Sequence, residues 1–331
     1  KNKEIGIILK HWMNSSLVNM FGWIEEFNTI ILRYILPRYF GPSTVFEGHS
    51  CQVNSVMFSP DGTKIVSSSA DETIRIWDIN LKKEIKILKG HLGYVNYAEF
   101  SSNGDMIVSC SIDKTIRLWD AQTGNEIKIL GRHEHEVVTV KFSHNGESIV
   151  SGSLDGEVVI WDVKSGQQKR RFKQWHEILD VAFSSDGGRI VVAIGDNSVQ
   201  IWDVHLWDKI QDLFYEGRKV HFSPNGSFLL CCSISGMCEI YNTTLSNIAI
   251  FTNQLGNKCR DVLNAKYFPD EHTIVTCLED HTIRLWDANS GEEIQRLEGH
   301  CLELTGLDTS PDGCAIVSSS RDNTIRLWKQ L

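Results

Sequence analysis

The sequence predicts an all-β protein in which seven four-stranded sheets pack as a ring, and three observations predict it. Trp-Asp pairs, or altered copies of them, recur seven times at steps of 42, 42, 41, 39, 45 and 42 residues. An Asp stands six residues before the aromatic residue in all copies but the fifth. Between these marks, side chains in short runs such as VNSVMF and TIRIWD alternate with a period of two residues, which is the pattern of β-strands.

Each repeat contains about four such runs, which turn residues separate. Five copies carry a turn of the Ser-Pro-Asp-Gly type, which starts at Phe58, Phe100, Phe142, Phe183 and Phe222. Pro fixes φ, Asp and Asn cap the turn, and Gly adopts a positive φ. Four strands form one sheet, which cannot bury both of its faces alone. Neighbouring sheets must therefore cover those faces, and a closed ring of seven achieves this.

Composition limits the kinds of partner and the cellular compartment that we expect for the protein. The chain of 331 residues has a formal charge of −9, which disfavours a general attraction to nucleic acid or to anionic membranes. Its nine Cys are scattered and form no CxxC pair. This usage is typical of a reduced intracellular protein, cytoplasmic or nuclear, rather than of a disulfide framework or a zinc site. No secretory signal and no apolar run of about 20 residues is visible.

The repeats resemble those of the WD-repeat β-propeller family over roughly residues 44–331. In that family a His, a Ser or Thr, an Asp and the Trp of one repeat are joined by hydrogen bonds. The resemblance implies four such sets: His49, Ser67, Asp71 and Trp77; His91, Ser109, Asp113 and Trp119; His133, Ser151, Asp155 and Trp161; and His300, Ser318, Asp322 and Trp328. Val192 and Cys231 hold the Ser/Thr position in repeats four and five. Packing is expected to replace the network there.

Two parts are expected along the chain. Residues 43–331 form the propeller, and only three residues follow Trp328, so the last sheet lacks its fourth strand. The segment STVFEGH before the first repeat aligns with EIKILKGH, which predicts that residues 43–47 supply that strand and close the ring. Residues 1–42 place apolar side chains at three- and four-residue spacings and are predicted to form a short α-helical extension. A pair packed on the ring, a dimerisation helix and a docking element remain open.

The many Asp and His residues do not predict an enzyme. They recur once per repeat, whereas an active site breaks such symmetry. The sequence contains no Gly-rich phosphate loop, no HExxH and no GxSxG. His133 and His135 could suggest a metal, but His133 is already the repeat histidine. We therefore expect no catalytic, cofactor-binding or metal-binding residues.

Partners of this family often bind the narrow face of the ring, around the central channel. The resemblance maps this face to the start of each first strand and to the position before the repeat Asp. The candidate partner-binding residues are Gln52, Tyr94, Asn96, Ile112, Glu136, Leu154, Glu177, Glu216, Arg218, Asp261, Glu279, Glu303 and Arg321. Acidic residues gather on repeats three to seven, which favours a basic peptide segment with an apolar anchor. A rim that only aids solubility is the alternative.

The leading interpretation is a non-catalytic protein–protein interaction scaffold, whose partners are other proteins, with no cofactor and no nucleic acid or membrane partner. A substrate receptor of a ubiquitin ligase is one alternative. Relatives that dock on the ligase adaptor carry Arg two residues after the Trp-Asp pair, where this chain has Asn80, Gln122, Lys164, His205 and Asn289. A subunit of an RNA-processing or chromatin complex is another, although no basic stripe supports it. The oligomeric state stays open.

Overall fold

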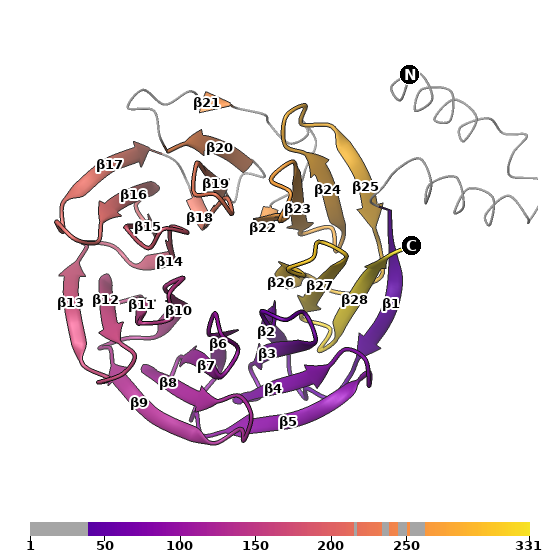
Figure 1. The fold of residues 1–331 in the computed structure, drawn as a ribbon, viewed down its shortest axis with the longest axis horizontal. Helices are drawn as coiled ribbons and strands as arrows, with labels where there is room; N and C mark the ends of the chain where they lie inside the picture. The colour runs from indigo at the N-terminus through magenta and orange to yellow at the C-terminus, as the bar shows by residue number, and fades with distance from the viewer. Residues whose placement is uncertain (1–38, 215–216, 234–237, 244–249, 252–261) are drawn as a thin grey trace, which may run out of the picture.

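A computed structural model describes residues 39–214, 217–233, 238–243, 250–251 and 262–331, and its regular elements there are all β-strands. The strands form seven antiparallel sheets of four strands each. These sheets stand around a central axis as the blades of a seven-bladed β-propeller (Figure 1). The predicted fold class is thereby confirmed for the described residues. Of the helical extension predicted for residues 1–42, residues 1–38 lie outside them, and residues 40–42 belong to a strand instead.

The first strand of each blade lies nearest the axis, and the fourth lies outermost (Figure 1). The strands of blades 1 to 3 are β2 (Val53–Phe58), β3 (Lys64–Ser69), β4 (Thr73–Asp78) and β5 (Lys83–Lys89); β6 (Val95–Phe100), β7 (Met106–Ser111), β8 (Thr115–Asp120) and β9 (Glu126–Arg132); and β10 (Val137–Phe142), β11 (Ser148–Ser153), β12 (Glu157–Asp162) and β13 (Gln168–Lys173). Those of blades 4 and 5 are β14 (Ile178–Phe183), β15 (Arg189–Ile194), β16 (Ser198–Asp203) and β17 (Lys209–Phe214); and β18 (Gly217–Phe222), β19 (Phe228–Ser233), β20 (Cys238–Asn242) and β21 (Ile250–Phe251).

Blades 6 and 7 complete the ring. Their strands are β22 (Val262–Tyr267), β23 (Thr273–Leu278), β24 (Ile283–Asp287) and β25 (Glu293–Leu297); and β26 (Leu304–Thr309), β27 (Ala315–Ser320), β28 (Ile325–Gln330) and β1 (Phe40–Phe46). Blade 7 thus joins the last three strands of the propeller to the first one. The N-terminal strand β1 pairs antiparallel with β28, so the ring is closed by hydrogen bonds between the two ends of the repeat array.

The closing strand begins at Phe40, three residues before the predicted segment 43–47 and inside the stretch assigned to helix. Two features of the tertiary structure explain the difference. Phe40 is only 1% exposed and packs on Phe268 of blade 6, with ring centroids 5.6 Å apart. The register shifts between Pro42 and Thr44, a bulge on an outermost strand, where a missing proline N–H is tolerated.

The blades are held together by apolar side chains that interdigitate between neighbouring sheets. Trp119 of blade 2 is 1% exposed and shares one cluster with Ile76 and Leu88 of blade 1. At the point of closure, Trp77 of blade 1 shares a cluster with Phe46 of β1 and Leu327 of β28. Burial of a large apolar side chain stabilises a fold by about 1.5–3 kcal/mol, so each interface adds several such contributions.

Polar contacts reinforce the same junction. The side-chain amide of Gln295, on β25 of blade 6, donates to the Phe40 carbonyl at 2.7 Å and accepts from the Phe40 N–H at 2.9 Å. Gln295 is 8% exposed. This pair of hydrogen bonds fixes β1 to the neighbouring blade as well as to its own. Within the described part of the chain, no helix has the length and apolar character that a membrane span requires.

Removing the closing strand should destabilise the whole ring. Deletion of residues 1–46 exposes one edge of β28 and strips the buried Phe40 and Phe46 from two blade interfaces. We expect its Tm to fall by more than about 5 °C relative to a control that lacks only residues 1–38. Thermal unfolding followed by circular dichroism measures the difference. Equal melting temperatures for the two deletions would show that β1 does not hold the ring closed.

Candidate functional site

The structure brings the repeat His, Ser, Asp and Trp together in blade 1. His49 Nε2 lies 2.8 Å from Ser67 Oγ, which accepts a hydrogen bond from Trp77 Nε1 at 2.8 Å. At its other side, His49 Nδ1 lies 2.8 Å from Asp71 Oδ2. The network ties the loop before the first strand to the turn before the third strand, and both to the core tryptophan.

Two further blades repeat this geometry. The same contacts join His91, Ser109, Asp113 and Trp119 in blade 2, and His300, Ser318, Asp322 and Trp328 in blade 7, at 2.8–3.0 Å. In blade 3, Ser151 contacts both His133 Nε2 and Trp161 Nε1 at 2.9 Å. However, His133 Nδ1 lies 3.3 Å from Asp155 Oδ2 and makes no hydrogen bond. Three sets are therefore complete, and the set of blade 3 is open at one link.

The complete sets keep their aspartates ionised. Burial raises the pKa of Asp113, but hydrogen bonds from His91 and Thr115 outweigh it and hold that pKa well below its ordinary value. The pKa values of Asp71 and Asp322 are lowered in the same way, by His49 with Thr73 and by His300 with Thr324 against their burial. These carboxylates serve the fold, because each is engaged by its own repeat.

Blades 4 and 5 replace the network, as the sequence indicates. Val192 stands where Ser is expected and is fully buried. Trp202 instead donates from Nε1 to Gln200 Oε1 at 3.1 Å, and Gln174 donates to the same oxygen at 3.0 Å. In blade 5 the hydroxyl of Tyr241 donates to the Glu239 carboxylate beside the buried Cys231. Packing and local polar contacts, through the Gln200 amide in blade 4 and the Glu239 carboxylate in blade 5, thus take the place of the histidine.

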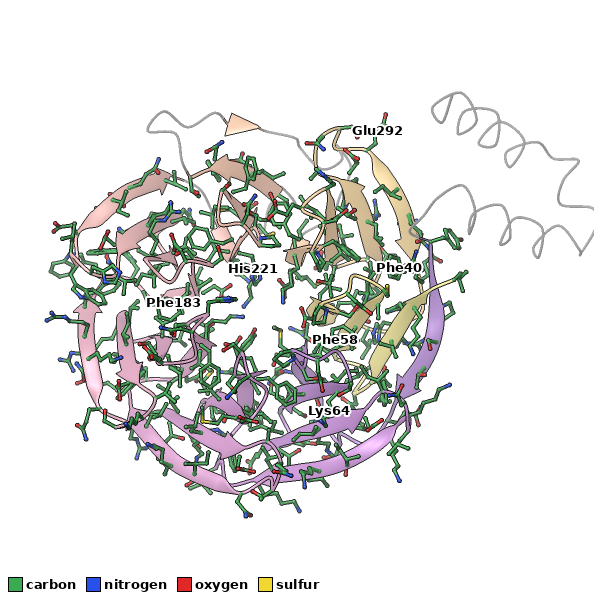
Figure 2. All side chains as sticks on the ribbon, in the orientation of Figure 1. Phe40, Phe58, Lys64, Phe183, His221 and Glu292 are labelled. Atoms are coloured by element: carbon green, nitrogen blue, oxygen red, sulfur yellow. The ribbon has the colours of Figure 1, made fainter. Side chains whose placement is uncertain are left out.

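The inner strands surround a central channel that residues from all seven blades line. Figure 2 shows His221 at this inner edge of the ring. Three ion pairs cross between adjacent blades: Glu99 with Lys141 at 3.8 Å, Asp180 with Lys219 at 3.9 Å, and Asp308 with Lys266. Each carboxylate also accepts a backbone N–H of the next blade, from Phe142, Val220 and Phe58 respectively.

These channel charges connect neighbouring blades. Burial raises the pKa of Glu99 and lowers the pKa of Lys141, while their mutual attraction opposes both changes. Burial also lowers the pKa of His221 to about 3, so this side chain is neutral in the channel. The free volume there is only about 40 Å³, which is room for a few water molecules. We call the three ion pairs of Glu99, Asp180 and Asp308 the channel belt. It was not predicted, although charged residues inside otherwise apolar first strands could have indicated it.

We call "top face" the face that carries the loops between blades and the turns between second and third strands. Most of the candidate partner-binding residues that the structure describes are exposed there: Tyr94, Glu136, Leu154, Glu177, Arg218, Glu279 and Arg321. Gln52, Asn96, Ile112 and Glu303 are partly buried. Glu216 and Asp261 lie outside the described residues. The expected half-ring of carboxylates is therefore traced in the structure only at blades 3, 4, 6 and 7.

Four of these residues have side-chain partners within the propeller, because Gln52 donates to Asn54 Oδ1 at 3.1 Å and Glu303, Arg321 and Asn96 make the contacts that follow. Glu303 Oε2 accepts from Arg321 Nη1 at 2.9 Å, which neutralises it. Asn96 donates to the Val137 carbonyl of the next blade at 2.9 Å, and Asn54 makes the equivalent bond to Val95. Asn96 thus supports the blade interface. Within the part of the chain that the structure describes, Glu136, Glu177 and Glu279 are exposed and form no ion pair, and the first two lie on the neighbouring blades 3 and 4.

Exposed apolar side chains accompany these acids. Trp175 is 99% exposed, Leu92 83%, Tyr94 50% and Leu154 40%. The loop of Trp175 is tied to the turn of Leu154, because Gln174 N–H donates to the Gly156 carbonyl at 2.8 Å. Trp175 and Leu92 are missing from the sequence-based candidates. Their positions in the sequence could have indicated them, because each stands one residue after the repeat-histidine position of its blade.

Comparison with known proteins agrees with the fold. A family model described as the IFT122 first beta-propeller matches residues 43–259. A model described as WD domain, G-beta repeat matches residues 249–287 and 291–329. The chain is also similar to guanine nucleotide-binding protein beta subunits of Homarus americanus (28% identical over 88 residues) and Caenorhabditis briggsae (30% over 88 residues). Each match covers 26% of this chain and 25% of the relative, so it spans about a quarter of either length.

The serine of a complete set should contribute strongly to stability. Ser109→Ala leaves His91 Nε2 and Trp119 Nε1 buried without their partner, which we expect to cost about 2–4 kcal/mol of unfolding free energy. Urea denaturation measures this cost. Ser102→Ala, at an exposed turn of the same blade, is the matched control and should change the free energy little. A cost as small as that of the control would show that the network does not stabilise the blade.

The complete sets should also make stability depend on pH. An Asp whose pKa is lower in the folded chain stabilises the fold above its ordinary pKa of 3.8, and this contribution is lost as pH falls below that value. The wild-type Tm should therefore drop as pH falls from about 4 towards 2, and Asp113→Asn should start lower and drop less. Asp105→Asn, in an exposed turn, should follow the wild type. Parallel profiles for all three proteins would contradict the assignment.

Proposed function

The chain belongs to the WD-repeat β-propeller family, and we propose that it is a non-catalytic scaffold that binds other proteins. The proposal rests on the contrast between side chains that make contacts within the fold and side chains that the fold leaves exposed. The described Asp and His of the repeats are largely engaged in the blade networks, and the charges of the channel pair with one another. The loops of the top face, in contrast, present side chains to solvent. Recognition on this face needs no chemical step.

The ligand that fits this face is a basic peptide segment with an apolar anchor. Glu136 and Glu177 supply negative charge on blades 3 and 4, and Trp175 and Leu154 supply apolar area beside them. Aromatic anchors of this kind carry much of the binding free energy in protein interfaces. The single observation that supports the proposal most is the 99% exposed Trp175, because an indole offers a large apolar area and one N–H donor that a partner can bury.

Cysteine usage favours an intracellular place of action. Among the described residues, eight cysteines are all free thiols, and five of them are buried. Small buried thiols act as apolar side chains in a reducing compartment.

Selection of peptides on the top face tests the proposal. A phage-displayed library of random peptides is selected on the immobilised chain, and the dissociation constants of enriched peptides are measured. We expect Lys or Arg next to a large apolar residue, and affinity that falls as salt rises. The triple variant Trp175→Ala, Glu136→Lys and Glu177→Lys should bind at least about tenfold more weakly, since it removes the anchor and reverses the field.

The control carries the same chemistry on the opposite face. Leu206→Ala with Glu147→Lys and Glu292→Lys changes turns that lie between first and second or third and fourth strands. The net charge changes equally, so a general charge effect would weaken both proteins alike. Enriched peptides without basic residues, or equal losses for the two variants, would count against the top face as the binding site.

A further inference from the structure

Blade 3 carries a modified version of the repeat network. In blades 1, 2 and 7 a Thr follows the repeat Asp by two residues, and its hydroxyl donates to Oδ1 of that Asp: Thr73, Thr115 and Thr324. The same hydroxyl lies 3.3–3.5 Å from Nδ1 of the histidine. In blade 3 this position is Glu157, whose carboxylate cannot donate when it is ionised. The hydroxyl is thus replaced by a second negative group.

The replacement leaves a buried cluster of potential ligands. One ligand atom each of His133, Asp155 and Glu157 lies within 4.8 Å of the other two. Their side chains are 1%, 1% and 6% exposed. His133 Nδ1 is buried without a hydrogen bond and faces Asp155 Oδ2 at 3.3 Å. Asp155 accepts the backbone N–H groups of Glu134 at 2.9 Å and of Glu157 at 2.8 Å, while His133 Nδ1 keeps no hydrogen bond. A cation between this nitrogen and the two carboxylates would offset the burial of two like charges.

The imidazole is prepared to act as a ligand. Burial lowers the pKa of His133, and the nearby carboxylates of Asp155 and Glu157 only partly offset that effect. The ring is therefore neutral near pH 7, with a nitrogen lone pair available. Nε2 is held by Ser151 Oγ at 2.9 Å, which orients Nδ1 towards the two carboxylates.

Two surface cations compete for the same charge. Arg171 Nε and Lys173 Nζ lie 3.6 Å and 3.9 Å from Glu157 Oε1. Both side chains are more than half exposed, at 56% and 57%, so water screens them and they can turn towards solvent. They neutralise Glu157 from outside the blade, and they leave Asp155 Oδ2 and His133 Nδ1 facing each other inside it.

We propose that His133, Asp155 and Glu157 bind a divalent transition-metal ion, Zn²⁺ in the first instance. Imidazole nitrogen and carboxylate oxygen are ligands that zinc accepts at about 2.0–2.2 Å, and water completes a set of three protein ligands. The three ligand atoms lie within 4.8 Å of one another, so side-chain rotation must bring them closer together around one ion. Because the neighbouring loop carries Glu134 and Glu136, the ion would fix one edge of the top face.

Metal titration of the full chain tests the site. Chelator-treated protein is titrated with ZnCl₂ by calorimetry, with CoCl₂ as a spectroscopic probe of nitrogen and oxygen ligands, and with MgCl₂ for comparison. We expect one saturable zinc site and a rise in Tm of about 5 °C at a hundredfold excess over Kd. Mg²⁺ should have little effect, because it favours all-oxygen sites.

Two variants make the test specific. Glu157→Thr restores the residue of blades 1, 2 and 7, so it should fold, and it should bind zinc at least about tenfold more weakly. It keeps the exposed Cys51, Cys301 and Cys314, so adventitious binding at those thiols would persist in it. Arg171→Gln with Lys173→Gln removes the competing cations and should tighten binding. The proposal is overturned if the wild type has no saturable site, if Glu157→Thr keeps the wild-type Kd, or if removal of the cations leaves Kd unchanged.

Discussion

Burial of two apolar faces on every sheet is the constraint on which this molecule depends. Each four-stranded sheet has an apolar face on either side, and no repeat can cover both of these faces itself. Trp77 and Trp119 show the consequence, because each is almost fully buried against side chains of the preceding blade. The last blade must therefore pack against a blade from the other end of the chain. Strand β1 connects the two ends because it pairs with β28. Ring closure is a requirement of packing, which hydrogen bonds then fix in register.

Polar groups inside the ring follow from the same packing. Once the sheets are in contact, buried donors and acceptors must find partners, and they do so in two layers. The repeat networks join loop, turn and core tryptophan within a blade, as His91, Ser109 and Trp119 do. The channel belt joins one blade to the next, as Glu99 does through Lys141 and the Phe142 amide. Together these contacts form the frame of the propeller, within each of these blades and from one blade to the next.

The side chains that are available to contact a partner are those that make no contacts within this frame. The top-face loops hold Trp175 and Leu154 in place through backbone hydrogen bonds while their side chains stay free to contact a partner. Blade 3 contributes twice, since its loops form part of this surface and its altered network gathers His133, Asp155 and Glu157 below it. Departure from the repeat pattern, rather than the pattern itself, marks the places where this chain differs from a generic propeller.

The sequence by itself determined the blade count and the four strands of each blade, because periodic spacing reports local geometry that each repeat obeys separately. The expected members of the repeat networks came from the resemblance to a known family. Tertiary structure decided what depends on contacts between repeats. The start of β1 at Phe40 is set by packing against Phe268, far away in sequence. The neutralisation of Glu303 by Arg321 and the open link at His133 depend on side-chain distances that no spacing encodes. The channel ion pairs likewise join residues about 40 positions apart, and only closure of the ring brings such residues to one axis.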